Sequence, residues 1–473
     1  MRSPKNIVWI VYDSLRADRT SISGYEHPTT PNFQRIASRP SGEAFTNTIA
    51  HAIWSLPSSA SMLTGTPPSY HNAGLENDVL PEEIPTVPGR LSEHGWRTVG
   101  LSGNSYFTEE TGLDRGFDEF TRLRTVPLRE SNLLSVAGPW TLLKFLLNLN
   151  RHSGGYTTDV RRHSANYLVN EIAKRQLTDL YRDDSPFFFY AHFPGAHHPY
   201  APPKPFRDRF LEAYDLPPAA AETAVERTTD IYEEIANGCE FTSTEWEAIS
   251  AMYDASVAYS DSLAGDLFDH IERHSDGETV VVLTADHGDL LGEQDLLSHK
   301  LVLHDAVVNV PMVVYGLPEL VGRSTDVVQH TDVMRTLLQR FDVPTDGMNG
   351  HDLSHSAREF AVTQRGAATY ENTLETLNQY DTNVDTDRFG DGLVTAVRTN
   401  QFKLVDYGDR KRLYRLPDED VDVSDRYPEK RSQLEAWLEQ WQSDNDERVS
   451  TSDATNFSAG AKQRLRDLGY VVE

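Results

Sequence analysis

Three runs of consecutive apolar residues each predict a buried β-strand. They cover residues 7–12, 187–193 and 279–283 and are rich in β-branched or aromatic side chains. Runs without polar alternation are typical of parallel strands that helices cover on both faces. In open α/β sheets ligands bind at the carboxyl ends of the strands, so the polar residues after each run are candidates for chemistry.

Helical segments separate these runs. The pattern predicts a helix over 87–94, stopped by Gly95 before a short strand at 98–102, and a long helix over 246–274 with one apolar stripe. A further apolar strand at 310–315 closes the core sheet. The alternation of helix and strand predicts an α/β protein with a doubly wound sheet.

The last part of the chain has a different pattern. Residues 370–391 are acidic and rich in Asn and Thr, and we expect them to be mobile. Residues 395–405 and 412–416 alternate apolar and polar side chains, which predicts half-buried antiparallel strands, and a helix follows at 432–443.

Residues 121–180 fit no regular pattern, and we expect an insertion near the mouth of the site that sets specificity. Their most apolar part, 131–150, is interrupted by Pro139 and Lys144 and falls short of a membrane span. We interpret it as a buried or lid helix. A peripheral helix that faces lipid is the alternative.

The chain of 473 residues carries 72 acidic and 44 basic residues, which gives a formal net charge of −28. Such a field repels nucleic acid and anionic membranes, so we expect neither as a partner. An acidic, lysine-poor surface suits a high-salt cytoplasm, where screening removes the self-repulsion. The single cysteine, Cys239, allows no intrachain disulfide and favours a reducing compartment. No targeting segment opens the chain, and we expect a cytoplasmic protein without an integral membrane segment.

Residues 51–65, HAIWSLPSSASMLTG, place the hydroxyl of Ser55 ahead of a helix expected to start at about Pro57. The N–H groups of Ser58 and Ser59 would then be unpaired and point toward Ser55. Such a helix start is a site for a tetrahedral oxyanion. The alternative is a polar loop that caps an ordinary helix.

Acidic and imidazole groups follow the predicted strands. Asp13 follows the first strand, and Asp286 and His287 follow the third. An adjacent acid and imidazole can reach one cation, and Asp13 would face the same rim. The alternative for these acids is a cap of the next helix or turn. His197 and His198 follow the remaining strand, where a single histidine is more often structural than catalytic, but two in a row before a proline loop favour a catalytic role.

Together these motifs resemble the sulfatase family of the alkaline phosphatase superfamily. SLPSSASMLTG is similar to the family signature, in which Cys or Ser begins a C/S-x-P-S-R motif, and NIVWIVYDSLRAD is similar to the family's opening. The resemblance covers most of residues 6–440. It implies an alkaline-phosphatase-like α/β fold, with a mixed, mostly parallel sheet flanked by helices and a smaller C-terminal antiparallel α+β subdomain. The implied domains are 1–345, the catalytic domain, and 346–473, the C-terminal subdomain with an acidic flexible stretch and a tail.

The resemblance also implies a site that uses one divalent metal ion. The implied roles are nucleophile for Ser55, metal ligands for Asp13, Asp286 and His287, contact with the transferred group or its leaving oxygen for His197, and cation for the anionic oxygens of the substrate for Lys300. His198 is the second choice for the histidine. The alternative for Lys300 is a solvated surface lysine.

The chain departs from the family pattern at four positions. The family's modified cysteine is Ser55, so formylglycine would require oxidation of the serine itself. The usual second Asp is Ser14, the frequent Asn is His287, and the signature Arg is Ser59. Loss of the Asp and the Asn makes the site less suited to Ca²⁺ and better suited to Mn²⁺, Mg²⁺ or Zn²⁺.

Three functions follow from these residues. The first is a metal-dependent hydrolase that cleaves sulfate esters through Ser55. The second is a phosphodiester or phosphonate hydrolase, or a phosphoglycerol-type transferase, that uses unmodified Ser55; its covalent ester would be hydrolysed or passed to an alcohol. The third is a catalytically silent member that binds anionic glycans. In each case the partner is a small-molecule or glycan anion.

Overall fold

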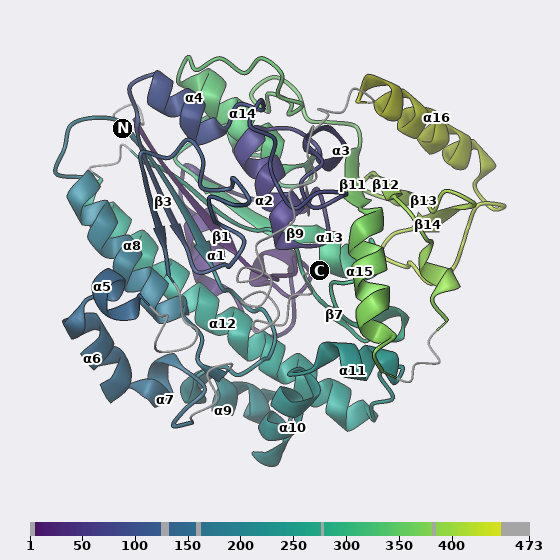
Figure 1. Ribbon diagram of the computed structural model, residues 1–473, viewed down its shortest axis with the longest axis horizontal. Helices are drawn as coiled ribbons and strands as arrows, with labels where there is room; N and C mark the ends of the chain where they lie inside the picture. Colours follow the sequence, from purple (N-terminus) through teal and green to yellow (C-terminus); the bar gives the residue numbers. More distant parts are fainter. Residues whose placement is uncertain (1–4, 124–131, 158–161, 276–278, 381–384, 446–473) are drawn as a thin grey trace.

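The computed structural model describes residues 5–123, 132–157, 162–275, 279–380 and 385–445. One eight-stranded sheet forms its centre. The strands of this sheet are β1 (Asn6–Tyr12), β2 (Gly42–Ile49), β3 (Arg97–Ser102), β4 (Glu119–Arg122), β5 (Phe187–Phe193), β6 (Thr279–Ala285), β9 (Asn309–Tyr315) and β10 (Val327–Val328). They lie in the order β10-β2-β9-β6-β1-β5-β3-β4. The sheet runs through the middle of the molecule (Figure 1).

The sheet is mixed and mostly parallel, which confirms the predicted fold class. β1 pairs in parallel with β5 and β6, and β3 pairs in parallel with β4 and β5. Among the described strands of this sheet, only β9 runs antiparallel to its neighbours, β2 and β6. Because β9 lies between these two, the apolar run at 310–315 is an inner strand and does not close an edge of the sheet. β2 was not predicted from the sequence.

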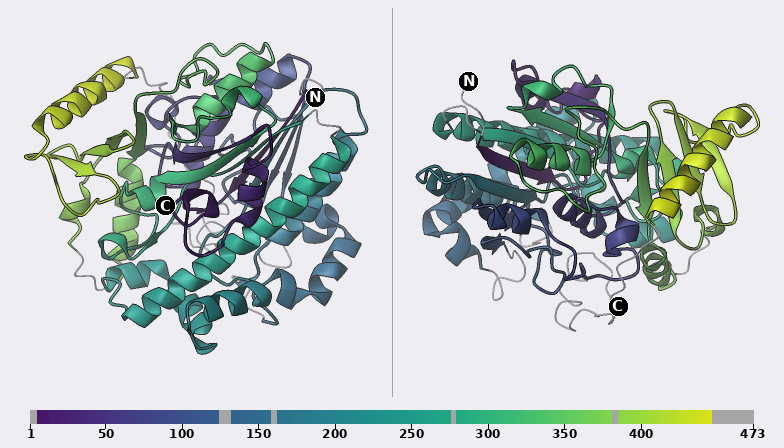
Figure 2. Two further views of the ribbon diagram at one scale, coloured as in Figure 1. Left: turned by 180° about the vertical axis from the view of Figure 1, so that it is seen from behind. Right: turned by 90° about the horizontal axis from the view of Figure 1, so that it is seen from above.

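Helices cover both faces of the sheet (Figure 2). The helices of this part of the chain are α1 (Pro31–Ala37), α2 (Ser55–Thr64), α3 (Pro68–His71), α4 (Val87–Glu93), α8 (Asn166–Leu180), α9 (Lys204–Ala213), α10 (Ala219–Arg227), α11 (Ile231–Ala236), α12 (Ser243–His274), α13 (Asp305–Val308) and α14 (His330–Arg340). Successive side chains of a strand point to opposite faces. Val8 and Ile10 of β1 therefore pack into one core with α12, and Ile7 and Trp9 pack into a second with α2 and α14.

A second, smaller sheet follows in the C-terminal part. Its antiparallel strands are β11 (Ala361–Arg365), β12 (Val394–Arg398), β13 (Phe402–Asp406) and β14 (Lys411–Arg415). Leu434 and Leu438 of α16 (Pro428–Asp444) pack on this sheet against Val397 and Leu404. The predicted antiparallel hairpin is confirmed, whereas β11 was not predicted from the sequence.

The segment 131–150 differs from its prediction. Its described part forms two short helices, α5 (Leu133–Ala137) and α6 (Pro139–Leu147), and leads into α7 (Leu149–His152). Gly138 separates α5 from α6 with a φ of +82°, which an ordinary helix does not adopt. Five large apolar side chains of this segment are exposed, so the prediction of a buried helix is wrong, whereas its form as a lid helix stays a prediction. Within the described residues, no helix combines the length and the apolarity needed to cross a bilayer.

The acidic segment 370–391 also differs, because α15 (Ala367–Leu377) occupies its beginning. Tyr370, Thr373 and Leu377 lie buried on one side of α15 at a spacing of three and four residues, and this packing orders the helix. Residues 381–384 and the predicted tail, 446–473, lie outside the described residues.

Candidate active site

The loop after β5 is held against the end of β1. The N–H of Asp13 donates to the carbonyl of Phe193 at 3.1 Å, and the carbonyl of Asp13 accepts from the N–H of Ala196 at 3.0 Å. Gly195 has a φ of +59°, and a Cβ at this position would lie 2.1 Å from the carbonyl oxygen of Asp13. Only glycine fits there. This close contact brings the loop that carries His197 to Asp13.

Helix α2 begins at Ser55, two residues before the predicted start. Trp54 is the extended residue before the helix, and the N–H of Ser58 donates to its carbonyl at 3.4 Å. The prediction of an unpaired N–H at Ser58 is therefore wrong. Pro57 falls within the first turn, where its missing N–H costs no hydrogen bond.

The side chain of Ser55 is buried and lies among polar groups from three other elements. Its Oγ lies 3.3 Å from Oδ2 of Asp13 and 3.4 Å from Nε2 of His287. Nδ2 of Asn104 donates to the same Oγ at 3.1 Å. Asn104 follows β3 and was not predicted as a site residue. Its position after an apolar strand, at the same rim of the sheet, was the available signal.

Asp13, Asp286 and His287 come together as a candidate cation site. One ligand atom from each lies within 4.8 Å of the others, and all three residues are buried. Nδ1 of His287 lies 3.0 Å from the carbonyl of Gly288 and donates to it, so in the neutral imidazole Nε2, 3.4 Å from Oδ1 of Asp13, carries the lone pair that would hold an ion. Two carboxylates and an imidazole oriented in this way fit a divalent ion such as Mn²⁺ or Zn²⁺.

A buried histidine supports the carboxylate of Asp286. Nε2 of His192, in β5, lies 3.1 Å from Oδ2 of Asp286. Burial alone would raise the pKa of Asp286, but the charge of His287 and the hydrogen bond with His192 hold it well below its usual range. Burial would lower the pKa of His287, but the carboxylates of Asp286 and Asp13 outweigh burial and raise it. His192 was not predicted, because within the strand it reads as part of an apolar run.

A chain of polar side chains leads to Lys300 at the edge of this site. The hairpin of β7 (Leu290–Leu291) and β8 (Leu297–Ser298) brings Asp289 and His299 together, with 2.5 Å between Oδ1 and Nδ1. Nζ of Lys300 donates to Nε2 of His299 at 3.2 Å, so Nδ1 of His299 carries the proton and donates to Asp289. The hydroxyl of Tyr200 donates to the other oxygen of Asp289 at 2.8 Å.

His197 and His198 lie beside this chain. The rings of His197 and His299 are 5.4 Å apart, and those of His287 and His299 are 4.2 Å apart. Burial lowers the pKa of both His197 and His198, so both imidazoles are neutral at pH 7. Burial also lowers the pKa of Lys300 to about 8, although the charge of Asp289 opposes this shift. The six residues predicted from the sequence thus gather at one rim of the sheet.

Comparison with known proteins decides the family. Residues 5–343 match the family model described as Sulfatase. The chain belongs to the sulfatase family. It is 25% identical over 403 residues to an arylsulfatase of Clostridium perfringens, and the aligned region covers 76% of this chain and 80% of the relative. It is 24% identical over 349 residues to a choline-sulfatase of Rhizobium meliloti, and the aligned region covers 70% of this chain and 66% of the relative.

Solved structures show the same fold. A phosphonate monoester hydrolase of Agrobacterium radiobacter superposes with a TM-score of 0.70 at 20% identity and covers 93% of this chain and 96% of that protein. A protein solved in complex with its substrate D-glucosamine-2-N,6-O-disulfate superposes with a TM-score of 0.67 at 17% identity and covers 94% and 98%. These likenesses confirm the fold over more than nine tenths of this chain.

The structure places two of the residues at which the chain departs from the sulfatase pattern. Ser14, where the family usually has a second Asp, donates its hydroxyl to Oδ1 of Asp13 at 2.9 Å. It therefore orients the neighbouring carboxylate and adds no negative charge. Ser59, at the position of the signature Arg, is completely buried within α2.

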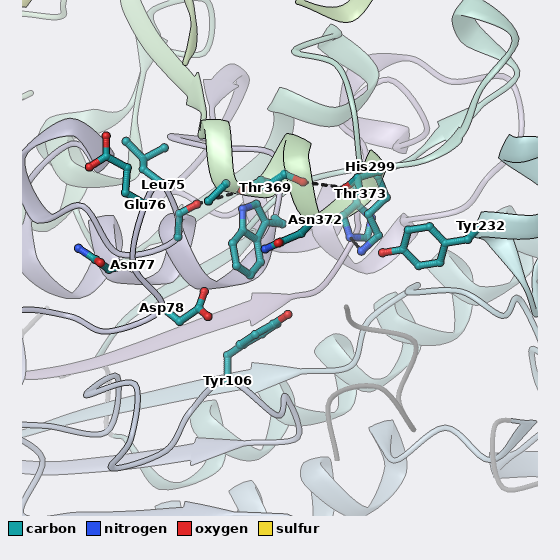
Figure 3. A pocket seen from close by; sticks show the side chains of 14 residues that line it. Leu75, Glu76, Asn77, Asp78, Tyr106, Tyr232, His299, Thr369, Asn372 and Thr373 are labelled. Atoms are coloured by element: carbon teal, nitrogen blue, oxygen red, sulfur yellow. Dashed lines mark hydrogen bonds between the residues drawn. The ribbon is translucent and has the colours of Figure 1, made fainter. Parts of the chain in front are cut away.

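A pocket opens beside the sulfatase signature segment (Figure 3). Its lining consists of Trp54, residues 74–78, Tyr106, Tyr232, His299, Lys300, Ala368, Thr369, Asn372 and Thr373. Asn77 and Asp78 lie on one side of the pocket in Figure 3, and Tyr232 lies on the other. None of the described residues of 121–180 lines this pocket, whereas α15 contributes four residues.

Proposed function

We propose that this sulfatase family member is a metal-dependent hydrolase that cleaves sulfate esters through Ser55. One observation carries the proposal: the hydroxyl of Ser55 lies 3.3 Å and 3.4 Å from Asp13 and His287, two members of the candidate cation site. The names of its relatives, an arylsulfatase and a choline-sulfatase, support the reaction class.

Asp13, Asp286 and His287 would hold the divalent ion. When bound, the ion supplies positive charge that lowers the pKa of the Ser55 hydroxyl and neutralises an oxygen of the ester. Asn104 fixes the orientation of Ser55 through its hydrogen bond to Oγ. Lys300, protonated below a pKa of about 8, attracts the remaining anionic oxygens of the substrate.

The reaction has two steps. In the first, Oγ of Ser55 gives up its proton and attacks the sulfur atom, the bond from sulfur to the leaving oxygen breaks, and that oxygen takes up a proton and departs as the alcohol, so Ser55 carries a sulfate ester. In the second, water attacks the sulfur of this ester, and the neutral imidazole of His197 takes a proton of the water. The bond from sulfur to Oγ then breaks, sulfate departs, and Oγ regains a proton. If Ser55 is instead oxidised to formylglycine, the hydrated aldehyde carries two hydroxyls. One takes the sulfate, and the other loses its proton and reforms the aldehyde as the bond from Cβ to the sulfate oxygen breaks, so no water attacks the ester.

The pocket beside Ser55 receives the leaving alcohol. Trp54 directly precedes Ser55, and its ring lies edge-on to that of Tyr106 with 5.2 Å between centroids. Aromatic walls of this kind bind apolar faces of rings, and the Asn and Thr side chains of α15 supply hydrogen bonds. We therefore expect an alcohol that contains a ring and carries hydroxyl groups.

A single observation favours the second candidate, a phosphoester or phosphonate hydrolase. An unmodified serine has one hydroxyl, so its covalent intermediate must be hydrolysed by water, as in serine-based phosphoryl transfer.

The test is turnover of nitrophenyl sulfate against nitrophenyl phosphate monoesters and diesters, with Mn²⁺, Mg²⁺, Ca²⁺ or Zn²⁺. Sulfate turnover supports the first candidate. Phosphoester turnover with sulfate untouched supports the second. If neither sulfate nor phosphate esters are turned over and the protein binds anionic glycans, it would be a non-catalytic member of the family.

A further inference from the structure

The outer side of the helix pair α5 and α6 is apolar and exposed. Within the described residues, eight large apolar side chains are exposed, and six of these lie between residues 134 and 156. Five of them belong to the helix pair: Leu134, Trp140, Leu143, Leu146 and Leu147, with exposed fractions of 66%, 76%, 45%, 57% and 69%. We name these five residues the α5–α6 face.

The spacing in α6 explains why this face is exposed. Trp140, Leu143 and Leu147 are three and four residues apart, so they share one side of the helix. Phe145 points the opposite way, is buried, and stacks on Tyr167 of α8 with 6.2 Å between centroids. A surface helix normally places polar residues outward. Here both sides are apolar, and only the inner side is covered by the described part of the chain.

The charge around the face differs from that of the rest of the chain. From Ser131 to Thr158 the sequence contains neither Asp nor Glu, although 72 of the 473 residues are acidic. Lys144 and Arg151 provide two bases in this stretch, and both are exposed. An apolar patch flanked by exposed bases and an exposed Trp is complementary to lipid acyl chains beneath phosphate headgroups.

We propose that the α5–α6 face docks the protein on the surface of a lipid bilayer without crossing it. Trp140 and the leucines enter the interface, while Lys144 and Arg151 contact the headgroup phosphates. A second copy of the chain fits less well, because five side chains on two short helices fall short of the area of a stable dimer interface. Two copies of the chain, each with a formal net charge of −28, also repel one another.

The net negative charge does not prevent this contact. Salt screens charges beyond about 8 Å at physiological ionic strength. Acids farther away than this contribute little where the face touches a headgroup. Glu171 of α8, which acts electrostatically on His152 of α7, is paired with Lys174 at 2.8 Å. The absence of acids from residues 131–158 removes the repulsion that would act at contact.

The test is flotation of the full chain with vesicles of phosphatidylcholine and phosphatidylglycerol, at moderate and at high salt. The test variant is Trp140→Glu with Leu146→Glu, and the matched control is Val421→Glu, an apolar residue that is 56% exposed in the C-terminal part. Wild type and the control should float with the vesicles. The vesicle-bound fraction of the double variant should fall at least tenfold, with melting temperature and ester turnover unchanged.

Failure of the wild type to float under either salt condition would overturn the proposal, as would equal flotation of wild type and double variant. If light scattering shows a dimer for the wild type and a monomer for the double variant, and neither floats with vesicles, the face would be assigned to a second copy of the chain instead. If the double Glu variant does not fold, Trp140→Ser with Leu146→Ser removes the same apolar area without adding charge. It should show the same loss.

Discussion

The side-chain amide of Asn104 donates a hydrogen bond to the Oγ of Ser55 at 3.1 Å. The same nitrogen lies 3.0 Å from Oδ2 of Asp13, and the N–H of Tyr106 donates to Oδ1 of Asn104 at 2.9 Å. The amide is thus held on one side by the backbone and aimed on the other at the proposed nucleophile. This arrangement holds Ser55 in one orientation relative to Asp13.

Replacement of Asn104 by Ala should therefore lower kcat by about 10²-fold, because an oriented donor at the reacting oxygen is lost. Metal affinity, measured by titration calorimetry, should also fall, because Nδ2 of Asn104 hydrogen-bonds Oδ2 of the proposed ligand Asp13. Measuring kcat at saturating metal therefore isolates the loss of the donor to Ser55. An unchanged kcat would show that Asp13 and His287 suffice to orient Ser55.

Replacement of Ser55 by Ala should lower ester turnover by at least about 10³-fold, because the nucleophile is removed. The melting temperature should change little, since only one oxygen is lost. Ser135→Ala, an exposed serine on α5, is the matched control and should keep full turnover. Peptide mass spectrometry of the wild type then distinguishes serine from formylglycine at this position. Full turnover in Ser55→Ala would exclude a covalent mechanism through this residue.

Addition of Mn²⁺ to the metal-free protein should raise its melting temperature, because an ion that binds only the folded state stabilises it by about 2.7 kcal/mol at 100 times its Kd. Asp286→Asn should abolish this shift. The matched control, Asp269→Asn on the exposed side of α12, should keep it. Equal shifts in both variants would place the ion elsewhere.

The KM for a sulfate ester should rise with pH above about 8. The pKa of Lys300 lies at about 8, so the ammonium is charged below this pH and loses its charge above it. Lys300→Arg should keep a low KM to higher pH, because guanidinium stays protonated. Lys300→Met should show a high KM that does not depend on pH in this range. A wild-type KM that is flat from pH 7 to about pH 9.5 would contradict the role of Lys300.

Replacement of Lys403 by Met should lower the free energy of unfolding by about 3–5 kcal/mol. Nζ of the fully buried Lys403 lies 2.7 Å from Glu419 and 3.1 Å from Asp305. Asp305 keeps its ion pair with Arg398, so removal of Lys403 leaves the buried carboxylate of Glu419 without its nearest cation. Lys411→Met, which breaks a looser pair of 3.8 Å with Asp406, should cost less than about 1 kcal/mol. Urea unfolding measures both. An equal loss of unfolding free energy in the two variants would show that burial does not strengthen the ion pairs of Lys403.

Much of the fold could be predicted because its signals are local. The apolar runs that became β1, β5 and β6 are long enough to specify buried strands by themselves. β2 and β11 were missed because their sequences, GEAFTNTI and AVTQR, mix polar and apolar residues and contain no long uninterrupted apolar run. The acidic composition around Tyr370 predicted mobility, and packing of one apolar side of α15 overrode it.

The sequence by itself determined the family, the mixed sheet and the residues at the ends of its strands, because parallel strands deliver those residues to one rim whatever the loops do. Only the tertiary structure decided how these residues meet. Asn104 and Ser55 are 49 residues apart, His192 and Asp286 are 94 residues apart, and Tyr200 and Asp289, where the chain to Lys300 begins, are 89 residues apart. Such contacts leave no periodic trace along the chain, since each is fixed by packing in three dimensions.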